Sequence, residues 1–475
     1  MKSKLAVLFL LLLIPIAAAP LDPAVQSLSH SILKELIEIN TTDTPRGNVT
    51  TAALAMQKRF AAAGLPASDM LLAGPNDRKQ NLIVRLRGAS TSLAPILIIG
   101  HIDVVEARRE DWTTDPFVLV EKGGYFYGRG TQDMKGSDAM VITTLLRFLH
   151  EGYKPDRDII LALTADEEGG TANGVDWLLK NKPEQVRAGF VLNPDAGGAN
   201  TVNGKPLNLD IEAAEKVYAD FLLTVRNPGG HSSLPVPDNA IYHLVDSLAR
   251  LEKYQFPFEL SPVTRGFFES IQKVATPEEA STINAVLVPH PDPAALARFS
   301  ANPRYNSTTH TTCVATRLNA GHANNALPQL AQANINCRIL PGHSIEEVRE
   351  NLLDIFADKE VRVQYIDSAT NEPRDTAPTE KGLPPVAIPA QITNTLLKTA
   401  TTFWAGAPLV PEMETGASDS KYTIARGIPT FGFSGLAIDR DDVRAHGKDE
   451  RVRITDYYDG VEFWYRWLKA LTSEN

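Results

Sequence analysis

The sequence predicts an α/β protein with a mixed, largely parallel β-sheet, helices on both sheet faces, and an inserted ferredoxin-like α+β domain. Three observations support this class. Short, fully apolar runs alternate with helical stretches through about the first 200 residues, as in a parallel sheet that is covered on both faces. The pattern changes to alternating strands near residue 215 and returns to the first pattern after about residue 390. Polar, glycine-rich clusters follow the apolar runs, where an α/β sheet places its functional groups.

The elements of the first part alternate in type along the chain. In order, we expect helices at residues 27–39 and 49–63, strands at 82–86 and 96–99, a helix at 135–150, a strand at 159–163, a helix around 175–179 and a strand at 190–192. Parallel strands need crossover connections, which these helices supply. The first part is therefore expected to form parallel βαβ units.

The second part has the element order of a split βαβ domain. The expected order is a strand at 218–225, a helix at 239–254, strands at 310–318 and 331–340, a helix at 344–356 and a strand at 361–365. Residues near 257–305 are interpreted as an insertion, and residues 367–389 as the return linker. From residue 391 the first pattern resumes, with a strand at 430–433 and a last helix from 455 to about 471.

These changes of pattern give a domain division. We expect a main domain made of residues 20–215 and 377–475, and an inserted domain at residues 216–376. A chain of 475 residues is long enough for two domains. The formal net charge of −10 argues against nucleic-acid binding, which needs a basic surface.

Residues 1–19 have the pattern of an export signal. Lys2 and Lys4 precede an apolar run at residues 5–14, and small residues at 17–19 form a cleavage zone. The run is too short to span a bilayer comfortably, so we expect no membrane anchor after processing. This pattern predicts an exported protein, periplasmic or secreted. An uncleaved anchor helix is the alternative.

Two cysteines, Cys313 and Cys337, are too few for a disulfide scaffold. They fall on adjacent strands of a predicted hairpin and are placed symmetrically about Asn325. A bridge between them is a hypothesis, which export to an oxidising compartment would permit.

Residues that ligate metals recur at five places, each after an apolar run or in a glycine-rich loop. They are His101 in GHID, Asp133 in GRGTQDMKG, the pair Glu167-Glu168 in TADEEGG, Asp195 in LNPDAGG and His446 in RAHGKDE. Histidine and carboxylate ligands suit zinc, and cobalt or manganese would fit the same ligands. A single histidine is more often a surface or core residue. Five clusters with the same placement predict a metal site.

Two further carboxylates accompany these clusters. Glu167 and Glu168 are adjacent and point in different directions, so one can bind metal while the other acts as a general base. Asp103 lies two residues after His101 and could accept a hydrogen bond from its other ring nitrogen or from a neighbouring group. Without further context, two adjacent glutamates would be interpreted as a solvated charge pair in a turn. The apolar strand before it and the two glycines after it favour a functional role.

The motifs GHIDVV, GRGTQDMKG, TADEEGG, NPGGHSSLP and GASDSKYTIARGIPTFGFSG together resemble those of the co-catalytic di-zinc metallopeptidases. That family includes glutamate carboxypeptidase, aminoacylase and succinyl-diaminopimelate desuccinylase. The resemblance covers essentially the whole mature chain and implies a role for each matching position. Asp133 would bridge two metal ions, His101 and Asp195 would complete one site, and Glu168 and His446 the other. Glu167 would be the general base and Asp103 would lie behind the first site, while the peptide after Asp133 is expected to be cis.

The resemblance also assigns roles in the inserted domain, which would serve as a lid and for homodimerisation. His231 would reach the active site of the partner subunit and stabilise an oxyanion. Arg338 would hold a substrate carboxylate, although a solvated strand arginine is an equally good interpretation. Asn325 and Gly416 would lie near the substrate. Cys337 stands where many relatives carry aspartate before this arginine, which changes the polarity of the pocket.

The function predicted from these residues is metal-dependent hydrolysis of a peptide or N-acyl amide bond next to a free carboxylate. The enzyme would be of carboxypeptidase or dipeptidase type, with an aminoacylase acting on N-acyl amino acids as the alternative. A different class, an exported two-domain solute-binding protein, would also fit the export signal, the charge and the domain number. It would not explain the five metal-ligand clusters.

Overall fold

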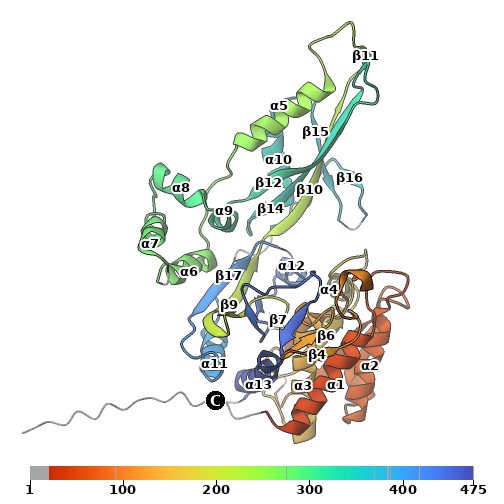
Figure 1. Cartoon of the computed structure of the whole chain (residues 1–475), viewed down its shortest axis with the longest axis vertical. Coiled ribbons are helices and arrows are strands. Elements are labelled where there is room, and N and C mark those ends of the chain that lie inside the picture. The colour runs from red at the N-terminus through yellow and green to blue at the C-terminus, as the bar shows by residue number, and fades with distance from the viewer. Residues whose placement is uncertain are drawn as a thin grey trace, which may run out of the picture.

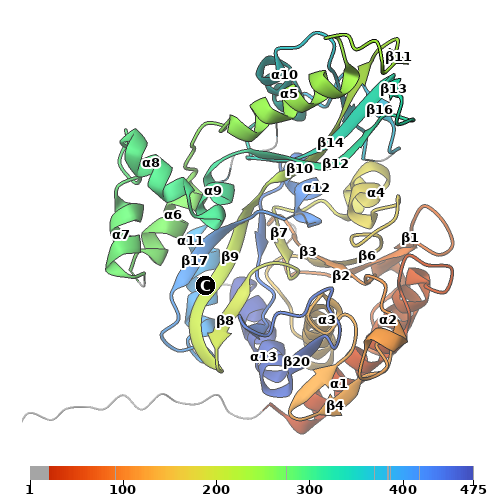
Figure 2. The ribbon, with the colours of Figure 1, turned by 45° about the horizontal axis from the view of Figure 1, so that its top comes forward.

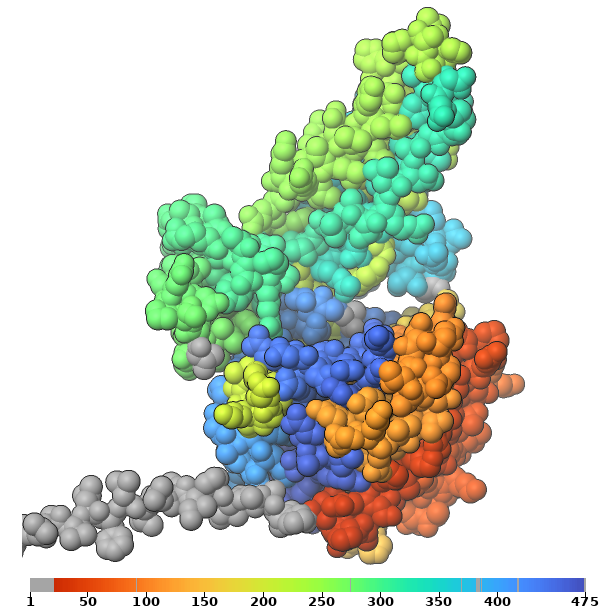
Figure 3. Space-filling view, in the orientation of Figure 1, coloured from red at the N-terminus to blue at the C-terminus, as the bar shows by residue number. Residues whose placement is uncertain are grey.

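The computed structural model describes residues 21–473, except for residues 91, 274, 369, 382–384, 386 and 417. Two lobes make up this part of the chain (Figure 1). The first lobe contains the first and last described helices, α1 (Pro23–Glu38) and α13 (Ile454–Leu471), and the second lobe projects from it as an elongated body (Figure 3). The predicted export signal lies outside the described residues.

A ten-stranded sheet forms the centre of the first lobe. Its main path runs in the order β1 (Met70–Ala73), β2 (Asn81–Leu86), β6 (Ile159–Thr164), β3 (Ile96–His101), β7 (Phe190–Asn193), β18 (Thr430–Gly432), β9 (Lys205–Glu215), β8 (Gly198–Val202) and β19 (Ala437–Asp439), and β17 (Leu409–Glu414) pairs with β9. The central strands β6, β3, β7 and β18 are parallel, whereas β1, β2 and β8 join antiparallel neighbours. The predicted mixed, largely parallel sheet is confirmed.

Helices cover both faces of this sheet (Figure 2). One face carries α1 (Pro23–Glu38), α2 (Val49–Ala62), α3 (Lys135–Glu151), α11 (Ala390–Ala400) and α13 (Ile454–Leu471), and the other carries α4 (Gly174–Asn181) and α12 (Ser420–Ala425). The central strands are buried on both faces, so their sequences are apolar throughout. None of the helices described in the structure is long and apolar enough to cross a bilayer.

Local sequence signals set several helix ends. Asn48 begins α2, because its side chain accepts the backbone N–H of Thr51. Gly152 ends α3 in the left-handed conformation. Short 3-10 turns at Ala67–Asp69, Arg109–Asp111 and Pro183–Gln185 complete the loops of the first lobe, and a small antiparallel sheet joins β4 (Val120–Lys122), β5 (Tyr125–Tyr127) and β20 (Arg451–Arg453).

The second lobe is built on a five-stranded antiparallel sheet. Its strand order is β12 (Thr312–Ala320), β14 (Leu330–Ile339), β10 (Val217–Arg226), β15 (Arg362–Ile366) and β16 (Pro373–Arg374). Helices α5 (Ala240–Lys253) and α10 (Ile345–Phe356) pack on one face, so residues along β14 alternate between buried and half-buried. The order β10-α5-β12-β14-α10-β15 is the predicted β-α-β-β-α-β order. The residue boundaries that we gave for the two domains stay a prediction.

Four short helices lie between α5 and β12, in the region predicted as an insertion. They are α6 (Pro262–Ile271), α7 (Pro277–Asn284), α8 (Pro293–Ser300) and α9 (Pro303–Thr309). Each begins with a proline behind a side-chain cap, which favours a sharp helix start. Phe267 and Phe268 of α6, Ile283 of α7 and Phe299 of α8 belong to a separate small core that also includes Val410 of β17.

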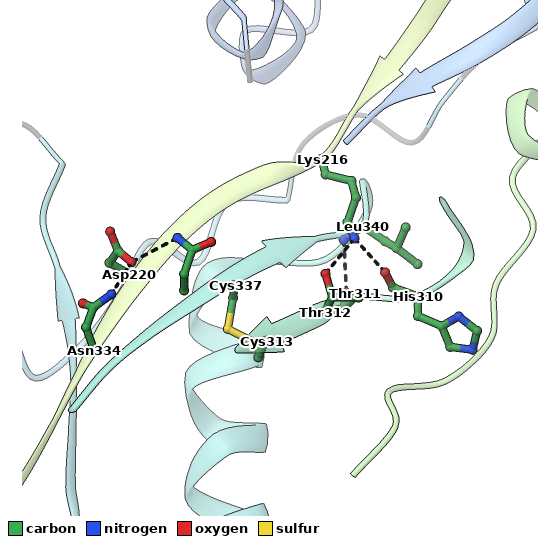
Figure 4. Close-up of a disulfide and its surroundings, with 10 residues drawn as sticks. Lys216, Asp220, His310, Thr311, Thr312, Cys313, Asn334, Cys337 and Leu340 are labelled. Carbon is green, nitrogen blue, oxygen red and sulfur yellow. Dashed lines mark hydrogen bonds between the residues drawn. A yellow bond between two sulfur atoms is a disulfide. The ribbon is translucent and has the colours of Figure 1, made fainter. Parts of the chain in front are cut away.

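Cys313 and Cys337 face each other on β12 and β14 and form a disulfide, with an S–S distance of 2.02 Å (Figure 4). The hypothesis of a bridge is therefore confirmed by the structure. Close by, Lys216 joins β9 of the first lobe to β10 of the second. Its ammonium group donates hydrogen bonds to the backbone oxygen of His310 (2.8 Å) and to the hydroxyl of Thr312 (3.2 Å). This residue ties the junction between the lobes to the start of β12.

Candidate active site

His101 ends β3 and is buried. Its Nδ1 lies 3.1 Å from the backbone oxygen of Asp103. A carbonyl oxygen can only accept, so this contact places the ring proton of a neutral His101 on Nδ1. The lone pair of Nε2 then faces two carboxylates, Asp133 Oδ1 at 3.1 Å and Asp195 Oδ1 at 3.5 Å. This is the orientation of a metal-binding imidazole.

A second group of ligand atoms shares Asp133. His446 Nε2 lies 3.0 Å from Asp133 Oδ2 and 2.8 Å from Glu168 Oε2. One ligand atom from each of these three residues lies within 4.8 Å of the others, and the same holds for the group of His101, Asp133 and Asp195. The structure therefore brings all five predicted ligands together and places Asp133 between the two groups.

The polar atoms of this centre fit bound cations. His101 Nε2 and Glu168 Oε1 are buried and have no hydrogen-bond partner in the described part of the chain, and an unpaired buried polar atom is costly. Burial would lower the pKa of His101, but the charges of Asp195 and Asp133 outweigh it and raise the pKa well above its usual value. Hydrogen bonds to Asp133 and Glu168 raise the pKa of His446 to about 10. The carboxylates thus attract positive charge, which divalent ions held by these residues would supply.

Glu167 and Asp103 lie beside the two ligand groups. The carboxylate of Asp103 accepts the backbone N–H groups of Glu167 (3.2 Å) and Glu168 (3.0 Å). Its nearest carboxylate oxygen is 3.7 Å from His101 Nδ1, so the backbone oxygen, and not the carboxylate, makes the closer contact to the ring. Asp103 therefore orients the turn that carries both glutamates. Burial raises the pKa of Glu167 to about 9, and bound cations would lower it again.

Several supporting residues were not predicted from the sequence. Asp419 is buried and accepts a hydrogen bond from Asn173 (2.6 Å) behind the turn of the two glutamates. Asn193 accepts the backbone N–H of Asp195 (3.1 Å) and donates to Ser420 (2.9 Å). Asp419 and Ser420 lie in the motif GASDSKYTIARGIPTFGFSG, which is part of the family resemblance. That motif was the only sequence feature that could have pointed to them. The peptide bond between Asp133 and Met134 is cis, as predicted.

His231 and Asn325 lie together at the far tip of the second lobe. His231 belongs to β11 (Gly230–His231), which pairs with β13 (Ala326–Leu327), and Ser232 donates its backbone N–H to the backbone oxygen of Asn325 (3.1 Å). Figure 1 shows β11 well away from the first lobe of the same chain. Ser233 donates its backbone N–H to Nδ1 of His231 (3.2 Å), so the neutral ring carries its proton on Nε2. Among the described residues this nitrogen has no hydrogen-bond partner, and His231 is exposed.

Arg338 lies on the face of the second sheet that carries no helix. It lines a groove of about 900 Å³ together with Tyr218, Asp220, Asn334 and Asn336. The guanidinium stacks on the Tyr218 ring at 4.7 Å, and its Nη1 is buried with no hydrogen-bond partner among the residues that the structure describes. No described carboxylate forms an ion pair with it. An arginine held in this way suits an anionic ligand.

Gly416 follows β17 in the first lobe, and its N–H donates to Glu414 Oε1 (2.7 Å). Two residues further on, Ser418 accepts a hydrogen bond from Asn193 (3.2 Å), the residue that also accepts the backbone N–H of Asp195, so the Gly416 loop lies close to the first ligand group. Of the predicted substrate-contact residues, His231 and Asn325 thus lie at the tip of the second lobe, Arg338 on its sheet, and Gly416 in the first lobe.

The mixed α/β fold and the two ligand groups define a candidate metal-dependent hydrolase. The chain belongs to the family described as Peptidase family M20/M25/M40, whose model matches residues 97–470. It is therefore an M20-family hydrolase, and the predicted resemblance to the metallopeptidases is confirmed.

Individual relatives agree with this assignment. The chain is 28% identical to the mouse N-fatty-acyl-amino acid synthase/hydrolase PM20D1, over 92% of this chain and 86% of the relative. It is 27% identical to human aminoacylase-1, over 81% and 82%. Among solved structures, it resembles an M20-family metallo-carboxypeptidase from Sulfolobus solfataricus, with a TM-score of 0.68 and 16% identity over 94% of this chain and 99% of that one. The last similarity shows the shared fold.

Proposed function

We propose that this protein is an exported hydrolase that uses two divalent metal ions to cleave a peptide or N-acyl amide bond next to a free carboxylate. The observation that carries the proposal is the pair of ligand groups that share Asp133, with Glu167 on the same turn as the ligand Glu168. One group would be His101, Asp133 and Asp195, and the other Asp133, Glu168 and His446. Zinc suits these ligands best, with cobalt or manganese as alternatives.

Bound metal ions would supply Lewis acidity and lower the pKa of a water molecule. Glu167 then acts as the general base. Its carboxylate is half-buried beside the ligands, takes a proton from the attacking water and later delivers that proton to the nitrogen of the leaving amine. Asp103 supports this step, because its carboxylate accepts the Glu167 N–H and fixes the turn.

His231 of the partner subunit would stabilise the oxyanion through Nε2–H. The position of β11 at the tip of the second lobe supports this proposal, since the tip lies away from the site of its own chain (Figure 1). The homodimer would form through the second lobe, where edge strand β12 exposes Val314 and Leu318, and α5 exposes Tyr242. An unpaired edge and exposed apolar side chains favour pairing with a second copy. Asn325 would accompany His231 into the partner's site.

Arg338 would bind the carboxylate of the substrate through its guanidinium. Its unpaired Nη1 and its stacking on Tyr218 support this role. A substrate held by its carboxylate is a peptide cleaved at its C-terminal residue, a dipeptide, or an N-acyl amino acid. Gly416 would contact the substrate through its backbone.

The aminoacylase alternative is favoured by the relatives, two of which are named an N-fatty-acyl-amino acid synthase/hydrolase and an aminoacylase. The carboxypeptidase type is favoured by the solved structure with the same fold. The solute-binding class needs no general base. Replacing Glu167 therefore distinguishes a solute-binding protein from an aminoacylase or a carboxypeptidase.

A Glu167→Ala variant tests the proposal. Loss of the base should lower kcat by about 10²–10⁴-fold while both metal ions stay bound, because Glu167 is in neither ligand group. Turnover is measured on an N-acyl amino acid, and bound metal is counted by elemental analysis. Glu184→Ala, at an exposed position on the surface, is the control. Turnover near that of the unmodified protein would show that Glu167 is not the base.

A further inference from the structure

His446 is the most exposed of the five ligand residues. Its side chain is 56% exposed, whereas that of Glu168 is 6% exposed. It lies in the connection between β19 and β20, which contains no helix or strand, and its φ is +62°. A ligand in such a loop is held at its metal only if other contacts fix the loop.

The side chain of Gln132 supplies contacts on both sides of His446. Its Oε1 accepts the backbone N–H of Arg444 (2.7 Å), two residues before the ligand. Its Nε2 donates to the backbone oxygens of Asp442 (3.2 Å) and Arg451 (2.8 Å). One amide therefore joins the two ends of the loop, and it belongs to the residue directly before Asp133.

The carboxylate of Glu450 makes the opposite connection, from the His446 loop to the loop of Asp133. Its Oε1 accepts the backbone N–H groups of Gly130 (3.1 Å), Gln132 (2.7 Å) and Asp133 (3.2 Å). Its Oε2 pairs with Arg129 at 2.6 Å, and the side chain is fully buried. Hydrogen bonds between charged and neutral groups are among the stronger ones in proteins, so this connection is rigid.

We propose that Gln132 and Glu450 are positioning residues that clamp the His446 loop onto the loop of Asp133. Each loop contributes one ligand and one clamping side chain, so the clamp sets the spacing of Asp133 and His446 in the second ligand group. The other group shares Asp133, but its remaining ligands, His101 and Asp195, are held by β3 and the residues after β7, so it depends less on the clamp. This proposal rests on the metal centre of the proposed function.

The clamp predicts a selective loss of metal binding. Residues that orient metal ligands typically contribute about 10–100-fold to metal affinity. Gln132→Ala should therefore weaken one of two binding events by about 10–100-fold and affect the other much less. Gln132→Glu should do the same, because it keeps the acceptor for Arg444 but removes the donors to Asp442 and Arg451. Glu450→Gln should also weaken this metal-binding event.

The test is isothermal titration of the full-length, metal-free protein with Zn²⁺, with thermal unfolding of the metal-free protein measured alongside. Gln80→Ala is the matched control, since Gln80 also donates to a loop carbonyl, that of Asn76 (2.7 Å), away from the site. We expect two binding events in the unmodified protein and in the control, and a selective loss of one in both Gln132 variants.

Three outcomes would overturn the clamp. They are unchanged binding in both Gln132 variants, equal weakening of both events, and fewer than two events in the unmodified protein. If Gln132→Ala does not fold, the near-isosteric Gln132→Glu decides. Because the titration needs no substrate, two bound ions without any hydrolysis would reject the proposed function and leave the clamp supported.

Discussion

The separation of Glu167 and His231 within one chain leads to a test by subunit mixing. Glu167 lies in the first lobe, whereas His231 lies at the tip of the second (Figure 1). If each active site combines Glu167 of one chain with His231 of the partner subunit, Glu167→Ala and His231→Ala should each inactivate their own homodimers. Loss of an oxyanion donor alone costs about 10²–10³-fold in kcat.

A mixed dimer of these two variants has one site with both residues and one site with neither. Random exchange of equal amounts makes half of the dimers mixed, so the mixture should recover about a quarter of the unmodified activity. The variants are mixed, incubated to allow exchange, and assayed on an N-acyl amino acid, with each variant incubated alone as the control. Dimer formation is checked by light scattering. No recovery in a mixture that has exchanged subunits would refute the placement of His231 in the partner's site.

Three further predictions concern other parts of the molecule. Arg338→Ala should lower kcat/KM for a substrate with a free carboxylate by about 10–100-fold, because a hydrogen bond to a charged group contributes about 1.5–3 kcal/mol. An equal effect on the same substrate with an amidated carboxylate would show that Arg338 does not bind that carboxylate. Replacing Cys313 and Cys337, 24 residues apart, by alanine should lower the free energy of unfolding by about 3 kcal/mol in urea titrations, and two free thiols in unfolded, unreduced protein would contradict the bridge. A hydrogen bond to Asp358 raises the pKa of His243, so this pair stabilises the fold below the usual imidazole pKa and loses that contribution as pH rises through the raised value. His243→Gln should therefore destabilise the protein more at pH 6 than at pH 9 in urea titrations, and an equal effect at both would contradict the assignment.

Strands that are buried on both faces could be predicted from the sequence. β3 and β6 are buried on both faces, so their apolar runs identified them directly. β9 was not predicted, although it is the longest strand of the first sheet. It carries Asp210, Glu212 and Glu215, which resemble a solvated segment in sequence but are buried in the structure. Burial of these carboxylates depends on the contact with β17, nearly 200 residues away in the chain, which no local pattern reveals.

The metal ligands could be predicted because each follows an apolar run or lies in a glycine-rich loop, where an α/β sheet places its functional groups. Their supporting residues could not. Gln132 and Glu450 are separated by 318 residues, and an isolated glutamine or glutamate carries no signal of a hydrogen bond over that distance. The position of His231 relative to the active site likewise depends on how the second lobe projects from the first.

The most direct test of the proposed hydrolysis is a substrate panel with the metal-loaded protein. The panel contains dipeptides and N-acyl amino acids, each matched by its C-terminal amide, and a chelator-treated sample runs beside it. We expect cleavage that requires metal and is lost when the carboxylate is amidated. Failure to cleave any member of the panel, with two metal ions bound, would contradict the assignment of this protein as an amide hydrolase.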